Sequence, residues 1–227
     1  MHEIPGLSTQ VLRLAKVIAQ SGFRMALRIL FERDGGTFNK IDSAEELVRM
    51  CVNAELLVFA GNGSRPVIDW LRELCIDFAT ETVGNVGAIG LCISGGFALS
   101  LTVGTNGRVR APIMSDSALP FALPFTDNTA AMHLTAAERT EISAAGPDVM
   151  GLRFSNDALC QRAHFDSYET LLGNTRFKRI EITSPAAPNR IGAHSHSALT
   201  NDFVNLAQSP TLKALGGVIA YSKANLA

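Results

Sequence analysis

One stretch of the chain, from Thr82 to Gly107, contains no charged side chain and combines apolar residues with many glycines. It is apolar enough to suggest a membrane-spanning helix, but the adjacent glycines Gly95 and Gly96 argue against one continuous helix. We interpret it instead as a buried strand over residues 86–91, a tight turn and a buried helix. Because fully buried strands are typical of parallel sheets covered on both faces, this stretch favours an α/β fold without a membrane span.

Helix and strand signals alternate along the rest of the chain, and no linker or internal repeat divides it. The alternation predicts a single α/β domain over residues 1–227, with a mostly parallel sheet and helices on both of its faces. Capping residues and prolines mark the helix starts, and glycine marks a helix end. Six further helices are expected: one from Ser8 to Gly22, one after Ser43–Glu46, one from Ser64–Pro66, one after Thr135–Glu138, one from about Ala158 to Leu172 and one after Ser209. The expected strands cover residues 23–30, 86–91, 109–114, 149–154 and 179–183. Residues 34–36 are expected to form a turn.

Composition narrows the classes of function. The 227 residues are 47% hydrophobic and 18% charged, with a formal net charge of -1 and no run of Lys or Arg, so we expect a globular protein that does not bind nucleic acid. None of the four cysteines forms a C-x-x-C pair and the N-terminus does not have the pattern of a signal peptide, so free thiols in a cytoplasmic location are the simpler interpretation. We expect a small-molecule substrate, no cofactor, no membrane association, and a monomer or homodimer.

The sequence Gly-Leu-Cys-Ile-Ser-Gly-Gly at residues 90–96 joins the buried strand to the apolar helix. It has the small-x-nucleophile-x-small pattern of a nucleophile elbow, a turn so sharp that the residues two before and two after the nucleophile must be small, as Gly90 and Ser94 are. The turn would expose Cys92 at the carboxyl end of the sheet, near a helix N-terminus that favours a thiolate. It would also direct the Ile93 N–H at a developing oxyanion. The alternative is that Cys92 is only a small buried apolar residue.

A hydrolase with such an elbow needs an acid and then a histidine later in the chain. Asp157 follows the expected strand 149–154 and is the candidate acid, although it could instead be the N-cap of the next helix. Asp148 precedes that strand and would lie at the opposite end of the sheet. His194 and His196 lie in a loop after the last expected strand, and either could be the histidine. The pair has no further ligands to complete a metal site, so we expect no metal.

Three segments resemble the dienelactone hydrolase family, in the same order and over almost the whole chain. The elbow is similar to that family's Gly-x-Cys-x-x-Gly-Gly segment. The opening residues 2–7, His-Glu-Ile-Pro-Gly-Leu, look like its loop after an early strand, and residues 196–200 look like its C-terminal His-Ser motif. The resemblance implies an α/β-hydrolase fold.

The same resemblance implies roles for individual residues. It implies a Cys92–Asp157–His196 triad and so selects His196 as the histidine. It implies that the loop holding Glu3 and Ile4 supplies a second oxyanion N–H, and that Glu3 interacts with the cysteine before substrate arrives.

The sequence departs from that family in two places. An arginine four residues after the histidine binds the substrate carboxylate in the family, whereas Thr200 stands there in this sequence, which favours a broader esterase or thioesterase. The family also has an apolar strand immediately before the opening loop, where this sequence has only Met1. We therefore expect an N-terminal truncation, or a gap beside the 86–91 strand that a neighbouring segment fills.

The function predicted from the sequence is hydrolysis of carboxylic esters, lactones or thioesters through an acyl-enzyme on Cys92. The alternative, which the missing strand favours, is a non-catalytic α/β-hydrolase-like protein that binds a small ligand or a partner. A redox-sensing thiol is a third hypothesis.

Overall fold

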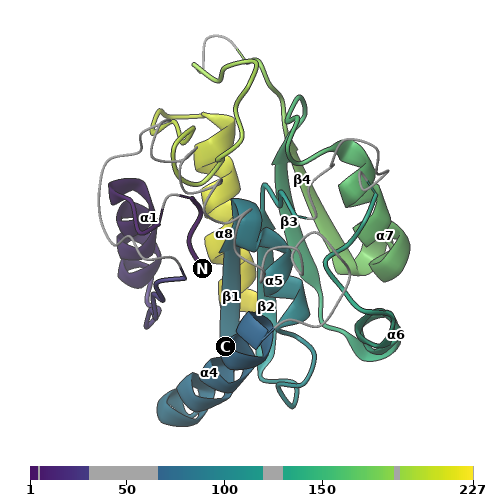
Figure 1. Cartoon of the computed structure of the whole chain (residues 1–227). Coiled ribbons are helices and arrows are strands. Elements are labelled where there is room, and N and C mark those ends of the chain that lie inside the picture. The colour runs from purple at the N-terminus through teal and green to yellow at the C-terminus, as the bar shows by residue number, and fades with distance from the viewer. Residues whose placement is uncertain (5, 31–65, 120–129, 187–189, 227) are drawn as a thin grey trace.

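The core of the fold is a parallel sheet whose strands follow one another in sequence order. A computed structural model describes residues 1–4, 6–30, 66–119, 130–186 and 190–226. In these residues the sheet order is β1-β2-β3-β4, and every neighbouring pair is parallel (Figure 1). The strands are β1 (Val86–Leu91), β2 (Val109–Ser115), β3 (Val149–Phe154) and β4 (Phe177–Ile182). The predicted parallel sheet is therefore confirmed.

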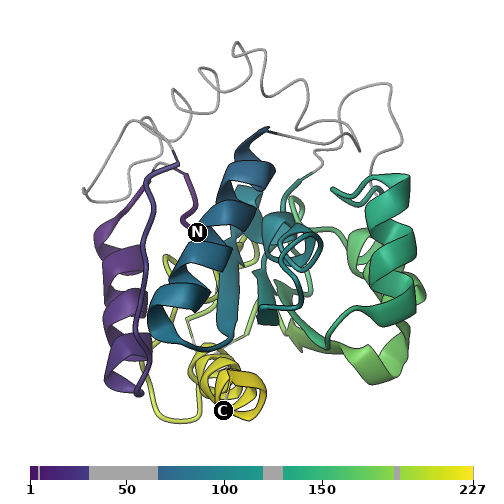
Figure 2. The same cartoon turned by 90° about the horizontal axis from the view of Figure 1, so that it is seen from below.

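Helices cover both faces of this sheet, as the alternating pattern predicts. Helices α1 (Thr9–Gln20) and α8 (Pro210–Leu226) pack on one face in one hydrophobic cluster. On the other face a second cluster holds α4 (Pro66–Thr82), α5 (Gly95–Ser100), α6 (Ala136–Ala145) and α7 (Arg162–Arg176). Figure 2 shows α8 on one side of the sheet and α4 with α5 on the other. The fold class is therefore an α/β fold with a parallel sheet between helices.

Local side-chain chemistry explains where several helices begin. The Ser8 hydroxyl accepts the N–H of Val11 at 3.3 Å and so caps α1. Thr135 and Glu138 form the predicted capping box, with bonds of 3.1 Å and 2.7 Å between each side chain and the other residue's N–H. At the other end of α1, Gly22 has a φ of 102°, a left-handed conformation that suits glycine.

The uncharged stretch from Thr82 to Gly107 contains β1, a 3₁₀ turn η1 (Cys92–Ser94) and the short helix α5. The interpretation as strand, turn and helix is therefore confirmed. Within the described ranges, no helix is both long enough and apolar enough to cross a bilayer.

One predicted strand is wrong. Residues 23–30 have no strand assignment in the structure. A cavity of about 530 Å³ is lined by Phe23, Met25 and Leu27 on one side and by residues 86–89 of β1 on another. Strands must lie about 4.8 Å apart to exchange hydrogen bonds, and the cavity occupies that position. Among the described residues β1 is thus an edge strand, and the Met1 amino group donates to the Ile89 carbonyl at 2.6 Å.

Other elements begin at a different residue from the prediction or cannot be compared with it. Helix α7 begins at Arg162 rather than near Ala158. The turn predicted at residues 34–36 and the helix predicted after Ser43 lie outside the described residues.

Candidate active site

Cys92 lies at the sharp bend between β1 and η1. Its φ is 52°, a left-handed conformation that a non-glycine residue adopts only under local constraint. The bend is tight because a Cβ on Gly90 would lie 2.1 Å from the Ser94 carbonyl oxygen. Inside the bend, the buried Ser94 hydroxyl accepts the Leu91 N–H at 3.0 Å. This local geometry is that of the strand–turn–helix elbow expected from the sequence.

The backbone of Cys92 is held from two directions. Its carbonyl accepts the N–H of Ala118 at 3.0 Å, from the segment that follows β2. It also accepts the N–H of Gly95 at the start of α5. A Cβ on Gly95 would lie 2.6 Å from the Ser117 Cα, so a glycine is needed for α5 to approach this segment. The two backbone bonds keep the sulfur-bearing residue in its strained conformation.

His196 and Asp157 are brought together although 39 residues separate them in sequence. The His196 Nδ1 atom lies 2.7 Å from Asp157 Oδ2. The other carboxylate oxygen of Asp157 accepts the N–H groups of Leu159 and Cys160 at 2.9 Å and 3.1 Å. Asp157 therefore caps the turn after β3 while it holds the imidazole. It is not the N-cap of the next helix, as the alternative held, because α7 begins at Arg162 with Gln161 as its N-cap.

The residues considered as alternatives lie elsewhere. The side chain of His194 is exposed. Asp148 forms an ion pair with Lys178 at 3.0 Å, at the start of β3 rather than at its carboxyl end.

Electrostatic interactions link His196 to Cys92. Burial alone would lower the pKa of His196, but the charges of Cys92 and Asp157 raise it well above its ordinary value. The Nε2 atom of His196 is buried and makes no hydrogen bond of ordinary geometry to a described residue. The surroundings of the ring therefore favour the protonated imidazole, and Nε2 is the ring nitrogen that is not bonded to Asp157.

Several polar contacts hold the segment that carries His196. One oxygen of Asp202 accepts the N–H groups of His196 at 2.8 Å and Ser197 at 3.0 Å. The Arg13 guanidinium, from α1, donates to the Leu199 carbonyl at 2.6 Å. These bonds restrict the imidazole because they fix the backbone on both sides of it.

The opening loop meets the elbow through His2. The His2 carbonyl accepts the Ser94 hydroxyl at 3.0 Å. Its ring accepts the Leu30 N–H at Nε2 (2.7 Å), and its Nδ1 lies 2.9 Å from the Glu3 carbonyl. Burial lowers the pKa of His2 to about 4, so the ring is neutral and Nδ1 is its donor. Ile4, which belongs to the same opening loop, is partly buried against the hydrophobic cluster that includes α4 and α5.

Glu3 faces the His196 segment rather than the elbow. One of its oxygens accepts the Ser197 hydroxyl at 2.8 Å, and the other accepts the Asn201 amide at 3.2 Å. Burial raises the pKa of Glu3 above its ordinary value, and the hydroxyls of Thr200 and Ser197 oppose that effect. The bonds of Glu3 to described side chains thus differ from the cysteine contact that the family resemblance implies.

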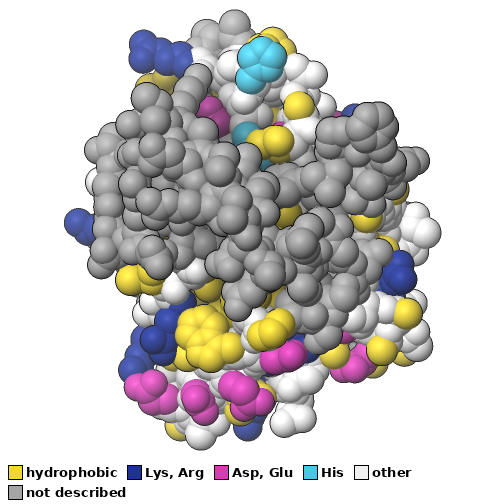
Figure 3. All heavy atoms as spheres, viewed as in Figure 1, with side chains coloured by type: hydrophobic (Ala, Val, Ile, Leu, Met, Phe, Trp, Pro, Cys, Tyr) yellow, Lys and Arg dark blue, Asp and Glu magenta, His cyan; other side chains and the backbone are white. Residues whose placement is uncertain are grey.

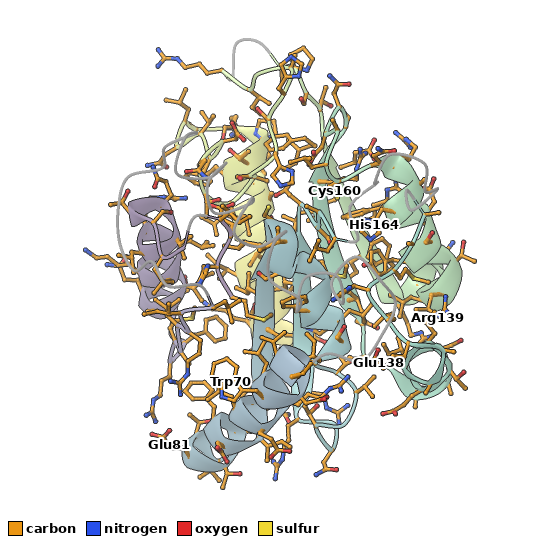
Figure 4. The ribbon with its side chains drawn as sticks, viewed as in Figure 1. Trp70, Glu81, Glu138, Arg139, Cys160 and His164 are labelled. Atoms are coloured by element: carbon orange, nitrogen blue, oxygen red, sulfur yellow. The ribbon has the colours of Figure 1, made fainter. Side chains whose placement is uncertain are left out.

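Two other cysteines are free thiols, of which Cys160 is buried and Cys75 is half-buried. Burial raises the pKa of Cys75 to about 11. Burial, together with the carboxylates of Asp116 and Asp157, raises the pKa of Cys160 well above its ordinary value. Figure 4 shows Cys160 beside the upper end of the sheet. Neither thiol is activated as a nucleophile, because only the thiolate attacks.

Three polar residues of this region, Asp116, Asp202 and Ser197, are not among the site residues that the sequence predicts. Asp116 follows β2 directly and so satisfies the same rule, an acid just after a strand, that selected Asp157. Ser197 lies in the His-Ser motif of residues 196–200 but has no role predicted from it, and no motif distinguishes Asp202. In the described part of the chain, no three His, Cys, Asp or Glu side chains are grouped so that they could hold a metal ion.

The face of the molecule that is seen in Figure 1 carries surface charges of both signs. Acidic and basic side chains lie side by side along its lower margin (Figure 3). Arg24 and Glu81 form an exposed ion pair.

No protein-family model and no curated protein matches this chain. Among solved structures, it is similar to the crystal structure of the Bacillus cereus carboxylesterase, with 18% sequence identity and a TM-score of 0.40. The similarity covers 68% of this chain and 59% of that chain, so this chain spans less than two thirds of that protein's length.

Proposed function

We propose that this chain is a hydrolase of carboxylic esters, lactones or thioesters in which Cys92 is the nucleophile, His196 the base and Asp157 the residue that orients the base. The observation that carries this proposal is the 2.7 Å bond between His196 and Asp157, on an imidazole whose pKa Cys92 helps to raise. The same three residues resemble the triad of dienelactone hydrolases. A thiolate–imidazolium pair of this kind attacks carbonyl carbon.

In the first half of the reaction, the Cys92 thiolate attacks the substrate carbonyl carbon and a C–S bond forms. The π electron pair moves to the carbonyl oxygen, where the N–H groups of Ile93 and Ile4 stabilise the negative charge. When the C=O bond re-forms, the bond to the leaving group breaks. His196 gives its Nε2 proton to the departing oxygen or sulfur, which leaves an acyl-enzyme and a neutral imidazole.

In the second half, water hydrolyses the thioester. The neutral His196 removes a proton from water, and the oxygen attacks the acyl carbon. Collapse breaks the C–S bond and releases the carboxylic acid. The role of Asp157 is to hold the imidazole and to stabilise its charged form.

The residue at position 200 bears on the class of substrate. The dienelactone hydrolases that this chain resembles have an arginine there for the substrate carboxylate, whereas Thr200 is neutral and only 3% exposed. Without that cation, a carboxylate on the substrate would lose its partner. We therefore favour uncharged esters, lactones and thioesters over dienelactone itself.

The test is turnover of p-nitrophenyl acetate by the wild type and by Cys92→Ala. We expect the variant to fall to the rate of the uncatalysed reaction. Cys160→Ala, which removes a buried thiol that is not activated, is the matched control and should retain wild-type turnover. Unchanged turnover in Cys92→Ala would exclude the mechanism.

The alternative function is binding without catalysis. The cavity of about 530 Å³ beside β1 favours it, because apolar cavities of this size are typical ligand sites. If the folded wild type gives no turnover of p-nitrophenyl acetate and no covalent adduct on Cys92, binding replaces hydrolysis as the proposed function.

A further inference from the structure

A second buried carboxyl group, that of Asp116, lies in the region of the proposed active site. It follows β2, has a φ of 51° and is only 2% exposed. Its N–H donates to the Leu152 carbonyl at 2.8 Å, which ties its backbone to β3. Its Oδ2 atom accepts the Ser115 hydroxyl at 2.7 Å and the Ala198 N–H at 2.9 Å. Asp116 is therefore fixed to the sheet on one side and to the His196 segment on the other.

The bond to Ala198 places this carboxyl group two residues from the proposed base. Asp202 anchors the backbone at His196 and Ser197, so Asp116 supplies the next anchor along the chain. Asp116 and Asp157 follow neighbouring strands, and the charge of His196 acts on Asp116. One carboxyl group thus bonds the imidazole directly, and a second bonds the backbone two residues after it.

We propose that Asp116 is a positioning residue for His196, which anchors the 196–199 segment through Ala198 and adds a second negative charge that stabilises the imidazolium. The consequence of Asp116 for catalysis rests on the proposed function, whereas the effect of Asp116 on the ionisation of His196 does not.

The ionisation of Asp116 makes this effect depend on pH. Burial raises the pKa of Asp116 to about 7, against the opposing influence of His196 and of the bonds from Ala198 and Ser115, while the charge of Asp157 raises it. The charge of Asp116 in turn contributes to the raised pKa of the Cys160 thiol.

The sign of the pH effect follows from which form of Asp116 carries charge. Above about pH 7 Asp116 is ionised and stabilises the imidazolium; below that pH it is neutral and this stabilisation is lost. Because folding raises the pKa of Asp116, its ionisation lowers the free energy of unfolding, and this loss of stability is greatest at high pH.

The decisive variant is Asp116→Asn, which can still accept the Ala198 N–H and the Ser115 hydroxyl but carries no charge at any pH. The readout is the pKa of His196, measured by NMR titration of histidine-labelled protein with His196→Gln to assign the signal. We expect Asp116→Asn to lower the measured pKa of His196 by about 1, the lower end of what an adjacent charge produces. Asp148→Asn, at the opposite end of β3, is the control and should leave it unchanged.

A second readout tests the anchor separately from the charge. Asp116→Ala removes the acceptor, and amide hydrogen exchange at Ala198 should then accelerate about tenfold, the factor for about 1.4 kcal/mol of lost protection. In Asp116→Asn the exchange rate should stay close to that of the wild type. The proposal is wrong if His196 titrates at the same pH in Asp116→Asn as in the wild type. It stands without the proposed function if the pKa of His196 falls while the wild type hydrolyses no ester.

Discussion

The elbow depends on Gly90, and replacing this glycine by alanine tests its geometry most sharply. A Cβ at position 90 would lie 2.1 Å from the Ser94 carbonyl oxygen, 2.8 Å from the Ser94 carbonyl carbon and 2.9 Å from the Gly95 Cα. All three neighbours are backbone atoms, so no side-chain rotation can relieve the contact. Ordinary contact distances exceed 3.4 Å, and the turn would have to open by more than 1 Å at its closest point.

The expected cost follows from this displacement. Overpacking a buried site costs about 1–3 kcal/mol, and a clash confined to backbone belongs at the upper end, about 3 kcal/mol. For a protein of this size, 1 kcal/mol lowers Tm by about 2–4 °C, so Gly90→Ala should unfold about 6–12 °C below the wild type. Turnover of p-nitrophenyl acetate should fall with it, because the opened turn displaces Cys92 from His196.

The assay is thermal unfolding followed by circular dichroism, with Gly84→Ala as the matched control. Gly84 lies just before β1, and the closest atom to its added Cβ would be the Thr82 carbonyl oxygen at 3.8 Å, an ordinary contact. This control should stay within about 0.5 kcal/mol of the wild type, the range of neutral surface substitutions. If Gly90→Ala matched Gly84→Ala in Tm and activity, the tight elbow would be refuted.

Three further substitutions or reactions test separate parts of the account. Asp157→Asn should lower kcat about 10²-fold or more, because the amide can donate to His196 Nδ1 and so stabilise the wrong tautomer of the imidazole. Steady-state kinetics with p-nitrophenyl acetate measure this loss, and an unchanged kcat would contradict the role of Asp157. Ser94→Ala should lower the free energy of unfolding in urea by about 1–3 kcal/mol, because the Leu91 N–H and the His2 carbonyl then lose their bonds to the buried hydroxyl. An unchanged free energy of unfolding would argue against a role of these bonds in stability. With iodoacetamide at pH 8, Cys75 and Cys160 should react last of the described thiols, since their raised pKa values leave little thiolate. Peptide mass spectrometry measures the order of reaction, and the opposite order would contradict this prediction.

Much of the local geometry of the candidate site could be predicted because it leaves a pattern in the sequence. A nucleophile elbow requires small residues at fixed positions, and Gly90 and Ser94 mark it in the sequence. Asp157 was predicted from its position after a strand, and the structure brings it to His196 at 2.7 Å. The choice of His196 over His194 came from the resemblance to dienelactone hydrolases.

The parts that could not be predicted depend on contacts between distant segments. Residues 23–30 have the apolar composition of a strand, but a strand exists only with a partner at hydrogen-bonding distance, and a cavity lies beside them. Helix α7 begins at Arg162 because the Asp157 carboxylate caps a separate turn before it. Asp116 follows a strand as Asp157 does, but its bond to Ala198 spans 82 residues of sequence and leaves no local pattern. Sequence patterns predict local geometry, and such long-range bonds lie beyond them.

The central claim is that an acyl group is transferred to the Cys92 sulfur. Rapid acid quenching during turnover of p-nitrophenyl acetate, followed by peptide mass spectrometry, detects that intermediate directly. We expect an acetyl group on the peptide containing Cys92 in the wild type, and no acetylation of that peptide in His196→Gln. Turnover with the acetyl group on another residue, or acetylation of Cys92 that does not depend on His196, would contradict the mechanism.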